Sequence, residues 1–454
     1  MFFVTIKEVL KISYYQTVFP LDEFDSRRNK VYDAIGKSVA VVQGASATGA
    51  FDLFRQTNEF YYLCGVEVPH AYLRLDGHNR STTLYLPQRD PKQERSEGPQ
   101  LNSSDPESAV RLTGVDDVKP LEALGQDILN AIGVYTPMAP AEGREACRDT
   151  LIHAKRLRDS DPWDRRPSTE KLFQEKLAAI CSNATFCDLS PILDQLRLIK
   201  SPREIALMRT AGELTANAII DAIRITRPGL VEFELAAIAD YRFLRSGARG
   251  PGYRPIVASG ANIWNAHYYR NQSILRDGDL ILMDYAPDCD CYTSDIGRMW
   301  PVNSRYSPFQ RELYGFVVEY HKVLLNTIRP HVLVSQLAQE AAEAIRPKWS
   351  DWPWSKPEYQ DAAKAMIESE VAFTHPVGMA VHDVGSYRSE PLKEGLVFAL
   401  DPQLWVKDEQ IYIRVEDTVV VTDSGVESLT CHAPLELDAI ESLVGSKTSD
   451  PHSN

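Results

Sequence analysis

The segment DYAPDCDCYTSD (284–295) places four aspartates and two cysteines in twelve consecutive positions. An EF-hand calcium loop needs glycine at its sixth position and a bidentate glutamate at its twelfth, but Cys289 and Asp295 occupy those places. A structural zinc site is also disfavoured, because Cys289-x-Cys291 has no distant partner pair to complete four ligands. The third interpretation is a hairpin that brings two carboxylates together.

That hairpin would join two apolar strands, DLILMDYA (279–286) and YTSDIGRMWPV (292–302). If its turn is centred between Cys289 and Asp290, Asp284 lies directly opposite Asp295, with the Cβ atoms about 4.5–5.5 Å apart. Two buried carboxylates at that distance need a cation between them or a raised pKa. The alternative is that the turn lies elsewhere and that both aspartates face solvent.

Further candidate ligands follow in the second half of the chain. HPVGMAVHD offers His375 and His382, and Asp401 ends an apolar strand. In IYIRVEDTVVVT, Arg414 and Glu416 are two residues apart and share one face of a strand, where an acid is costly unless it is paired or coordinated. Each residue alone is more often structural than catalytic. Together, carboxylates and an imidazole suit a dinuclear Mn, Co or Zn centre with metals about 3.5–4 Å apart.

Length and composition predict a soluble protein of two domains, with 454 residues, 44% hydrophobic and 25% charged. The boundary is expected where a long amphipathic helix begins, with Ser201 as N-cap, Pro202 in the first turn and Glu204 completing a capping box. The predicted parts are an N-terminal domain (1–194), a C-terminal domain (195–445) and a disordered tail (446–454).

Local patterns predict the elements of both halves. The N-terminal domain is expected to hold β-strands and a long surface loop: strands at 38–44, 60–66, 71–77 and 82–88, and the loop at 89–108. The C-terminal domain is expected to be α+β, because its strands and helices are segregated: β-hairpins within 253–302, helices within 308–346, and strands at 396–400 and 411–421.

The formal net charge of −14 makes nucleic acid and anionic membranes unfavourable partners. No apolar stretch of about 18 residues or more suggests a transmembrane helix. The N-terminal segment is interrupted by Lys7, Glu8 and Lys11, so no signal peptide is expected. Seven scattered cysteines without a C-x-x-C motif fit reduced thiols. The predicted location is the cytoplasm.

The chain resembles the pita-bread metallopeptidases, specifically their aminopeptidase P and prolidase branch. DYA…YTSDIGRMWPVN is similar to the family's two-aspartate hairpin, HPVGMAVHD to its histidine loop, and RVEDTVVVT to its last glutamate strand. IVASGANIWNAHYYRNQ matches the segment that ends in a substrate-facing histidine, here His267. RQTNEFYYLCGVEVPHAYL (55–73) resembles the aminopeptidase P N-terminal domain. The resemblance covers most of the chain.

The resemblance implies an Xaa-Pro aminopeptidase with two divalent metal ions, with Mn²⁺ as the expected ion and Zn²⁺, Co²⁺ or Fe²⁺ as alternatives. It assigns the metals to five side chains, of which Asp295 and Glu416 would bridge: Asp284, Asp295, His375, Asp401 and Glu416. It assigns the substrate site to His267, His382 and Arg414, and Asp401 would also move a proton. A hydroxide activated by the metals would attack the carbonyl before proline. Trp405 follows Asp401 closely enough to line the substrate pocket, or belongs to the core.

Two positions depart from the family pattern. Asp401-Pro402-Gln403 stands where the family has E-P-G, and aspartate is one methylene shorter than glutamate. Val371 stands where the family usually has a histidine, so one substrate hydrogen bond is missing. Metal binding is still expected despite both departures. They count against full peptidase activity.

Other functions stay open at this point. A prolidase restricted to Xaa-Pro dipeptides, or a related hydrolase, would use the same ligands. A non-catalytic pita-bread domain that binds peptides or proteins is favoured by Val371 and Asp401 and opposed by the retained acids. The resemblance also implies a homodimer or a higher homo-oligomer that acts on a peptide substrate.

Overall fold

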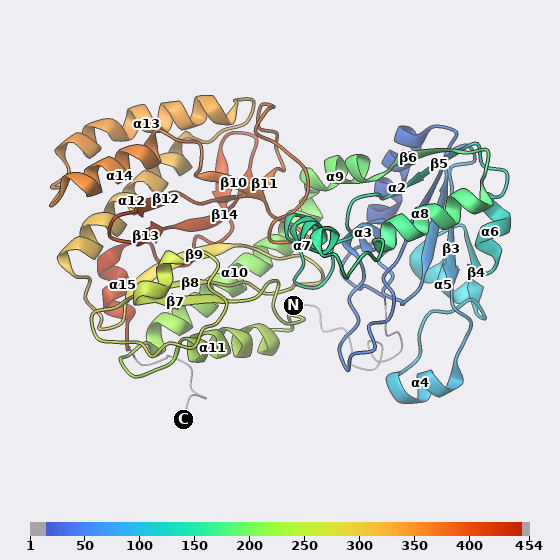
Figure 1. Ribbon diagram of the computed structural model, residues 1–454, viewed down its shortest axis with the longest axis horizontal. Helices are drawn as coiled ribbons and strands as arrows, with labels where there is room; N and C mark the ends of the chain where they lie inside the picture. The colour runs from blue at the N-terminus through green and yellow to red at the C-terminus, as the bar shows by residue number, and fades with distance from the viewer. Residues whose placement is uncertain (1–14, 447–454) are drawn as a thin grey trace. The chain divides into compact units, whose positions relative to one another are not determined.

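The computed structural model describes residues 15–446, and the chain divides into two units, Met1–Leu196 and Arg197–Asn454 (Figure 1). The division falls within helix α9 (Ser190–Leu198), next to the boundary predicted between residues 194 and 195. The segment examined for a signal peptide lies mostly outside the described residues. The predicted tail 446–454 does too, except for residue 446.

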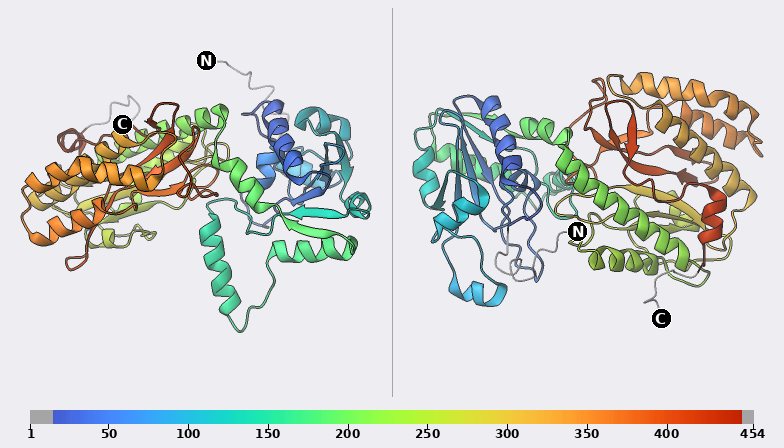
Figure 2. Two further views of the ribbon diagram at one scale, coloured as in Figure 1. Left: turned by 90° about the horizontal axis from the view of Figure 1, so that it is seen from above. Right: turned by 180° about the vertical axis from the view of Figure 1, so that it is seen from behind.

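The N-terminal unit is built on a mixed six-stranded sheet in the order β4-β3-β2-β1-β5-β6. Its strands are β1 (Val39–Gln43), β2 (Tyr72–Asp76), β3 (Ser81–Leu86), β4 (Asp117–Pro120), β5 (Gly133–Thr136) and β6 (Thr185–Asp188). Its helices, besides α9, are α2 (Leu21–Ile35), α3 (Asn58–Cys64), α4 (Pro91–Glu97), α5 (Pro106–Thr113), α6 (Ala123–Ile128), α7 (Arg148–Ser160) and α8 (Thr169–Ile180). Helix α7 projects away from the sheet (Figure 2) and buries none of its residues.

The strands predicted at 38–44, 71–77 and 82–88 are confirmed as β1, β2 and β3. The strand predicted at 60–66 is wrong, because that run forms helix α3. Every residue of α3 is buried, so the run shows no amphipathic period, and a short apolar run does not distinguish a helix from a strand. Gly65 ends the helix in the left-handed conformation, with its N–H bonded to Tyr61 O.

The single surface loop predicted at 89–108 is also wrong, because it contains α4 and the beginning of α5. Each helix begins with an Asp-Pro pair. Asp90 accepts hydrogen bonds from the backbone N–H groups of Lys92 and Gln93, and Asp105 accepts one from Ser108. An aspartate N-cap followed by proline is a recognisable helix start, and it outweighed the polar composition of this stretch.

The C-terminal unit is built on a seven-stranded sheet, in which β10-β11-β14-β9-β8-β7 lie in order and β15 pairs with β14. Two further strands, β12 and β13, pair with each other. The strands are β7 (Ile256–Ser259), β8 (Leu280–Asp284), β9 (Ile296–Pro301), β10 (Phe373–Pro376), β11 (Val397–Leu400), β12 (Gln403–Val406), β13 (Ile411–Arg414), β14 (Glu416–Val421) and β15 (Val426–Ser428).

The helices of this unit form two groups that flank the strands (Figure 1). Helices α10 and α11 pack on each other, α10 also contacts β9, and α12, α13 and α14 pack together. Their bounds, with those of the short 3₁₀ helix and the last helix, are α10 (Pro202–Ile225), α11 (Glu232–Arg245), η1 (Gly260–Trp264), α12 (Pro308–Thr327), α13 (Val334–Asp351), α14 (Pro357–Ile367) and α15 (Leu437–Leu443). The start of α10 is confirmed: Ser201 and Glu204 form the capping box in both directions, and Pro202 follows.

The hairpin is present, but its predicted register is wrong. Asp284 pairs with Gly297 rather than with Asp295. The turn is formed by Asp290 and Cys291, which have φ values of 49° and 70°, between the bridged residues Cys289 and Tyr292. Because side chains alternate along a strand, a shift of two residues keeps Asp295 on the side of the hairpin that the prediction gave it.

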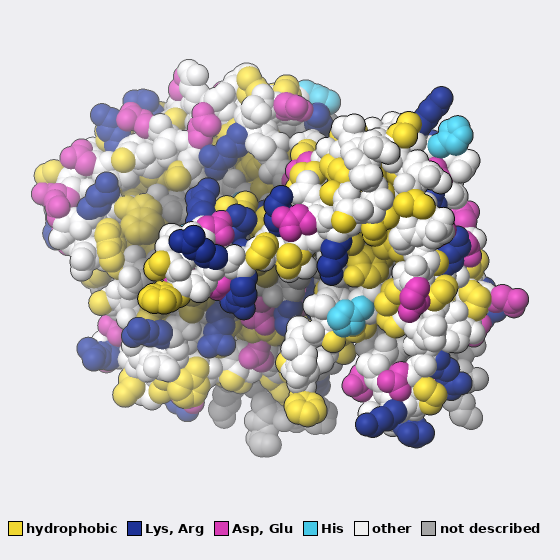
Figure 3. Space-filling view, turned by 45° about the vertical axis from the view of Figure 1, so that its right-hand side comes forward, with side chains coloured by type: hydrophobic (Ala, Val, Ile, Leu, Met, Phe, Trp, Pro, Cys, Tyr) yellow, Lys and Arg dark blue, Asp and Glu magenta, His cyan; other side chains and the backbone are white. Residues whose placement is uncertain are grey.

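Surface features add little that is specific. Figure 3 shows Lys and Arg side chains mixed with Asp and Glu on the face in view. Among the described helices, none is long and apolar enough to span a membrane. The seven cysteines all lie in the described part of the chain, and none takes part in a disulfide there.

Candidate metal centre

Three adjacent strands of the C-terminal unit bring two of the predicted ligands together around a glycine. Gly297 on β9 pairs with Asp284 on β8 and with Glu416 on β14. A Cβ atom at position 297 would lie 2.7 Å from Nε of Arg414, so only glycine leaves room for that guanidinium. Gly297 was not among the predicted site residues, although a glycine inside an apolar strand often marks a close approach of other groups.

A tyrosine that the sequence analysis also missed connects the two aspartates of the hairpin. The Tyr253 hydroxyl lies 2.6 Å from Oδ1 of Asp284 and 3.0 Å from Oδ1 of Asp295. The hydroxyl has a single proton, so it satisfies both carboxylates best when one of them is protonated. The carboxylates that the hairpin was expected to bring together are therefore neighbours, through Tyr253 rather than by direct pairing.

Asp295, His375 and Glu416 form the tightest group of potential ligands. One ligand atom from each lies within 4.8 Å of the others, and His375 Nε2 is 3.5 Å from Asp295 Oδ2. His375 lies on β10, and its Nδ1 is 3.1 Å from the carbonyl oxygen of Pro376. A proton on Nδ1 would donate to that carbonyl and leave the Nε2 lone pair directed at the two carboxylates, which is the usual arrangement of a metal-binding histidine.

Arg414 links this group to the remaining two acids. Its Nη2 contacts Glu416 Oε2 and lies 2.6 Å from Asp284 Oδ2, while its Nε is 3.7 Å from Asp401 Oδ1. The strand predicted at 411–421 is divided at Val415 into β13 and β14. Arg414 and Glu416 nevertheless meet on one side of it, as their spacing predicted.

Burial gives the acids unusual titration behaviour. Asp295, Asp401 and Glu416 are each at most 3% exposed, and desolvation raises the pKa of all three, well above the ordinary range for Asp295 and Glu416. The neighbouring carboxylate of Asp284 adds to the rise for Asp295. Burial disfavours the charged form of Arg414, but the adjacent acids outweigh this effect and raise its pKa.

The donor set fits divalent metal ions. Carboxylate oxygens and one imidazole are the ligands of hard and borderline metals such as Mn²⁺, Co²⁺ and Zn²⁺. Among the described residues, none donates a hydrogen bond to Oδ1 of Asp401, which is buried. A buried carboxylate oxygen without a donor is costly unless a cation meets it. A metal would satisfy Asp401 Oδ1 and relieve the crowding of the acids beside it.

The predicted substrate residues lie near this group. His382 is partly buried, with its ring centroid 3.9 Å from that of His375 and 6.1 Å from that of His267, which is exposed. Trp405 is partly buried and stacks on Tyr412 at 3.9 Å, so it supports the β12–β13 hairpin and still presents part of its surface. Val371, at the position of the missing histidine, is 43% exposed.

The loop between His375 and His382 is held by an ion pair that the sequence analysis did not identify. Asp383 is buried and accepts from Arg197 Nη2 at 2.5 Å and from Lys200 Nζ at 3.1 Å. Burial alone would raise the pKa of Asp383, but the two cations outweigh it and lower that pKa. Both cations lie at the beginning of the C-terminal unit, in the segment RLIK that precedes α10.

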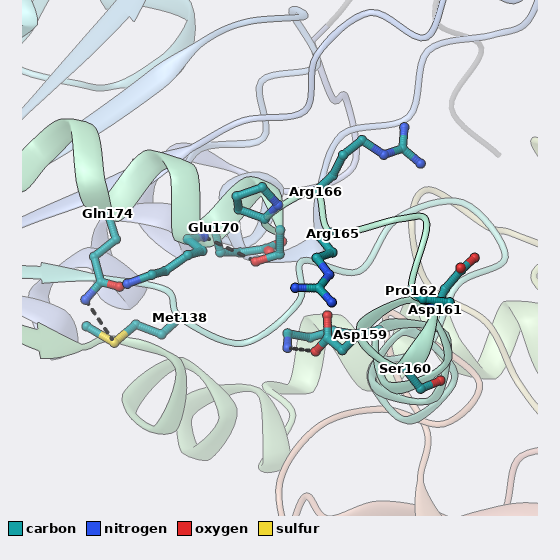
Figure 4. Close-up of a pocket in the computed structure, with 13 residues that line it drawn as sticks. Met138, Asp159, Ser160, Asp161, Pro162, Arg165, Arg166, Glu170 and Gln174 are labelled. Atoms are coloured by element: carbon teal, nitrogen blue, oxygen red, sulfur yellow. Dashed lines mark hydrogen bonds and ion pairs between the residues drawn. The ribbon is translucent and has the colours of Figure 1, made fainter.

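The N-terminal unit has a large surface hollow of about 830 Å³ between the end of α7 and α8. Asp159, Arg165 and Glu170 are among the residues that line it (Figure 4). Lys155 Nζ is 2.5 Å from Asp159 Oδ2, and both side chains are close to half exposed. Glu170 accepts a hydrogen bond from the backbone of Ala141. Arg165 and Arg166 are exposed. This hollow therefore lacks the buried acids that distinguish the metal centre.

Comparison with known proteins agrees with this geometry. The model of metallopeptidase family M24 matches residues 206–423, and that of the aminopeptidase P N-terminal domain matches residues 24–179. The chain is 30% identical to Xaa-Pro aminopeptidase of Escherichia coli, over 93% of this chain and 97% of the relative. It is 31% identical to Xaa-Pro aminopeptidase 3 of Mus musculus, over 87% of this chain and 78% of that relative.

The structure is similar to that of zinc-substituted E. coli aminopeptidase P in complex with product. The TM-score is 0.77 at 29% identity, covering 95% of this chain and 100% of that one. The fold class predicted from the sequence, an N-terminal α/β domain followed by a pita-bread catalytic domain, is therefore confirmed.

Proposed function

Since the chain belongs to metallopeptidase family M24 and carries an aminopeptidase P N-terminal domain, we propose that it removes the N-terminal residue from peptides with proline in second position. The observation that carries the proposal is the group of the buried Asp295 and Glu416 with the partly buried His375, whose ligand atoms lie within 4.8 Å of one another. Asp284 and Asp401 join that group through Arg414.

These five side chains would hold two divalent metals, and we propose Mn²⁺ as the natural ion. Bound metals would lower the pKa of a water molecule and polarise the scissile carbonyl. The protein residues hold the ligands in place. Tyr253 fixes the two aspartates of the hairpin, and Arg414 orients Glu416.

Two histidines would act on the substrate. His382 lies beside His375, within reach of an oxygen that develops negative charge next to the centre. The ring centroid of His267 lies 6.1 Å from that of His382, and His267 stacks on Tyr269 with ring centroids 6.0 Å apart. The pair would bind the peptide around the proline residue, with Trp405 as an apolar wall.

The test is a cleavage assay on the purified, Mn²⁺-loaded protein. An Xaa-Pro-Yaa tripeptide and an Xaa-Pro dipeptide are incubated separately, with and without EDTA, and release of the N-terminal amino acid is followed. Chelator-sensitive cleavage of the tripeptide is the expected result. Cleavage of the dipeptide alone would indicate a prolidase, and a protein that binds metal but cleaves neither would refute the proposal.

A matched pair of variants separates the metal centre from general damage. Asp295→Asn should lose activity by at least about 10³-fold, because it removes a charged ligand. Asp423→Asn replaces an exposed aspartate of the same unit and should leave activity within twofold. Equal losses in both variants would contradict the assignment of Asp295.

We further propose that the protein works in the cytoplasm as a homodimer or a higher homo-oligomer. Thiols without disulfides support the location. Helix α7 buries no residue, and Trp163 after it is 94% exposed, so this part of the chain has apolar surface available for contact with a second copy. Light scattering at micromolar concentration measures the assembly, and a monomer would exclude it.

A further inference from the structure

We propose that Gln403 is a positioning residue, whose side-chain amide orients Asp401 so that one carboxylate oxygen is presented to the metals. The inference rests on the proposed metal centre and concerns a residue outside the five ligands. Nε2 of Gln403 donates a hydrogen bond to Oδ2 of Asp401. Among the described residues, the other oxygen, Oδ1, has no donor although it is buried.

The two carboxylate oxygens of Asp401 therefore have separate environments. Oδ2 is held by the amide, and Oδ1 faces the centre, where the nearest cationic atom is Nε of Arg414 at 3.7 Å. That distance is too long for a hydrogen bond, and Nε of Arg414 is itself buried without a hydrogen-bond partner in the described part of the chain. Oδ1 is thus the oxygen available to a metal.

Backbone geometry keeps the amide and the carboxylate in register. Pro402 stands between them, and its ring fixes its φ and restricts the residue before it to extended conformations. Gln403 is the first residue of β12 and pairs with Arg414 on β13. The amide is therefore attached to the same hairpin that carries the arginine of the centre.

The length of the acid explains why such support is needed. The carboxylate of an aspartate lies one carbon–carbon bond, about 1.5 Å, closer to the backbone than that of a glutamate. A short carboxylate reaches a metal in few orientations, and the hydrogen bond to Oδ2 selects one of them. Asp401 and Gln403 then act as a coupled pair: Gln403 strengthens metal binding only when Asp401 is present, and Asp401 binds metal well only when Gln403 holds it.

Coupling gives a test by a double-mutant cycle with the Mn²⁺ dissociation constant as the readout. Gln403→Met removes the donor while keeping the side-chain length and strand pairing. With Asp401 in place, it should raise the Mn²⁺ dissociation constant by about 10–100-fold, the usual effect of removing a partner of a metal ligand. In an Asp401→Glu background the same change should alter it by less than threefold, because the longer acid does not fit the amide contact.

Gln410→Gly is the matched control. Gln410 lies in the turn of the same hairpin, is exposed and has a φ of 52°, a conformation that glycine adopts readily. This control should leave the dissociation constant and the tryptophan fluorescence unchanged. Kinetics add a second readout, since Gln403→Met should lower kcat more than it changes KM when Mn²⁺ is saturating.

The outcomes distinguish this inference from the proposed function. A wild-type protein that binds Mn²⁺ but cleaves no Xaa-Pro peptide refutes the function, while the affinities still decide the role of Gln403. A change below threefold for Gln403→Met with Asp401 in place, or the same change in both backgrounds, overturns the positioning role. A wild-type protein that binds no Mn²⁺ overturns both.

Discussion

Replacing Asp417 by asparagine should destabilise the C-terminal unit strongly, although Asp417 is not a proposed metal ligand. Its Oδ1 accepts from Arg298 Nη2 at 2.7 Å and from the Thr430 hydroxyl, and its Oδ2 is 2.7 Å from Nε2 of His321. Arg298 in turn donates to the backbone carbonyl of Glu416 at 2.5 Å. The network thus holds the strand that carries a proposed ligand.

The magnitude follows from burial. The side chains of Arg298 and Asp417 are 0% and 1% exposed, so the substitution leaves a buried guanidinium without its counter-charge. Removing one partner of such a pair costs about 3–5 kcal/mol of the free energy of unfolding. For a unit of this size, each kcal/mol lowers Tm by about 2–4 °C. The expected drop is therefore about 6–20 °C.

Intrinsic tryptophan fluorescence is a suitable assay. Of the tryptophans, only Trp163 lies in the N-terminal unit, and it is 94% exposed before unfolding, so the signal reports the C-terminal unit. Urea titrations of EDTA-treated protein compare the wild type, Asp417→Asn and the control Asp438→Asn. Asp438 pairs with Arg311 at the surface, where its side chain is 88% exposed, and its loss should change stability by less than about 0.5 kcal/mol.

The pH dependence gives an independent check. Burial opposes ionisation of Asp417, but Arg298 and His321 outweigh it, so its pKa in the folded protein is lowered. A lowered pKa stabilises the folded state above the unfolded value of about 3.9, and the effect disappears as pH falls below that value. The deficit of Asp417→Asn should be complete from pH 7 to 5 and shrink below about pH 4. A deficit under 1 kcal/mol, or one that grows on acidification, would refute the reasoning.

Three further predictions concern the centre itself. Burial raises the pKa values of Asp295 and Glu416, so the metal-free protein should lose stability as pH rises above their unfolded values of about 4. The Tm difference between Mn²⁺-loaded and EDTA-treated protein should widen in the same direction, and a constant difference in calorimetry would contradict this. Asp383→Asn leaves two buried cations with a neutral partner, so it should lower Tm and reduce kcat/KM by about tenfold, measured against the exposed control Asp423→Asn. His382→Ala should reduce kcat by about 10²-fold while metal content, measured by mass spectrometry, stays unchanged; loss of metal would instead make it a ligand.

The wrong predictions of the fold have different physical causes. The α3 run is buried on every side, so neither helical nor strand periodicity was present to read. The hairpin register depended on which two residues adopt positive φ, and Asp290 and Cys291 do so without a glycine that would have indicated the turn. The helices α4 and α5, in contrast, each carry a local signal, because an aspartate N-cap at residue 90 or 105 is followed by proline.

The helix start at Ser201, three of the four predicted N-terminal strands and the fold class were determined by the sequence alone, because each depends on local spacing or on motifs in a recognisable order. The sequence also supplied the residues that we propose as metal ligands. The neighbours of the ligands were decided only by the tertiary structure. Tyr253 meets Asp284 across 31 residues of chain, and Gly297 pairs with Glu416 on a strand more than a hundred residues away. Hydrogen bonds and close approaches between such distant segments leave no periodicity in the chain, so only folding reveals which residues meet.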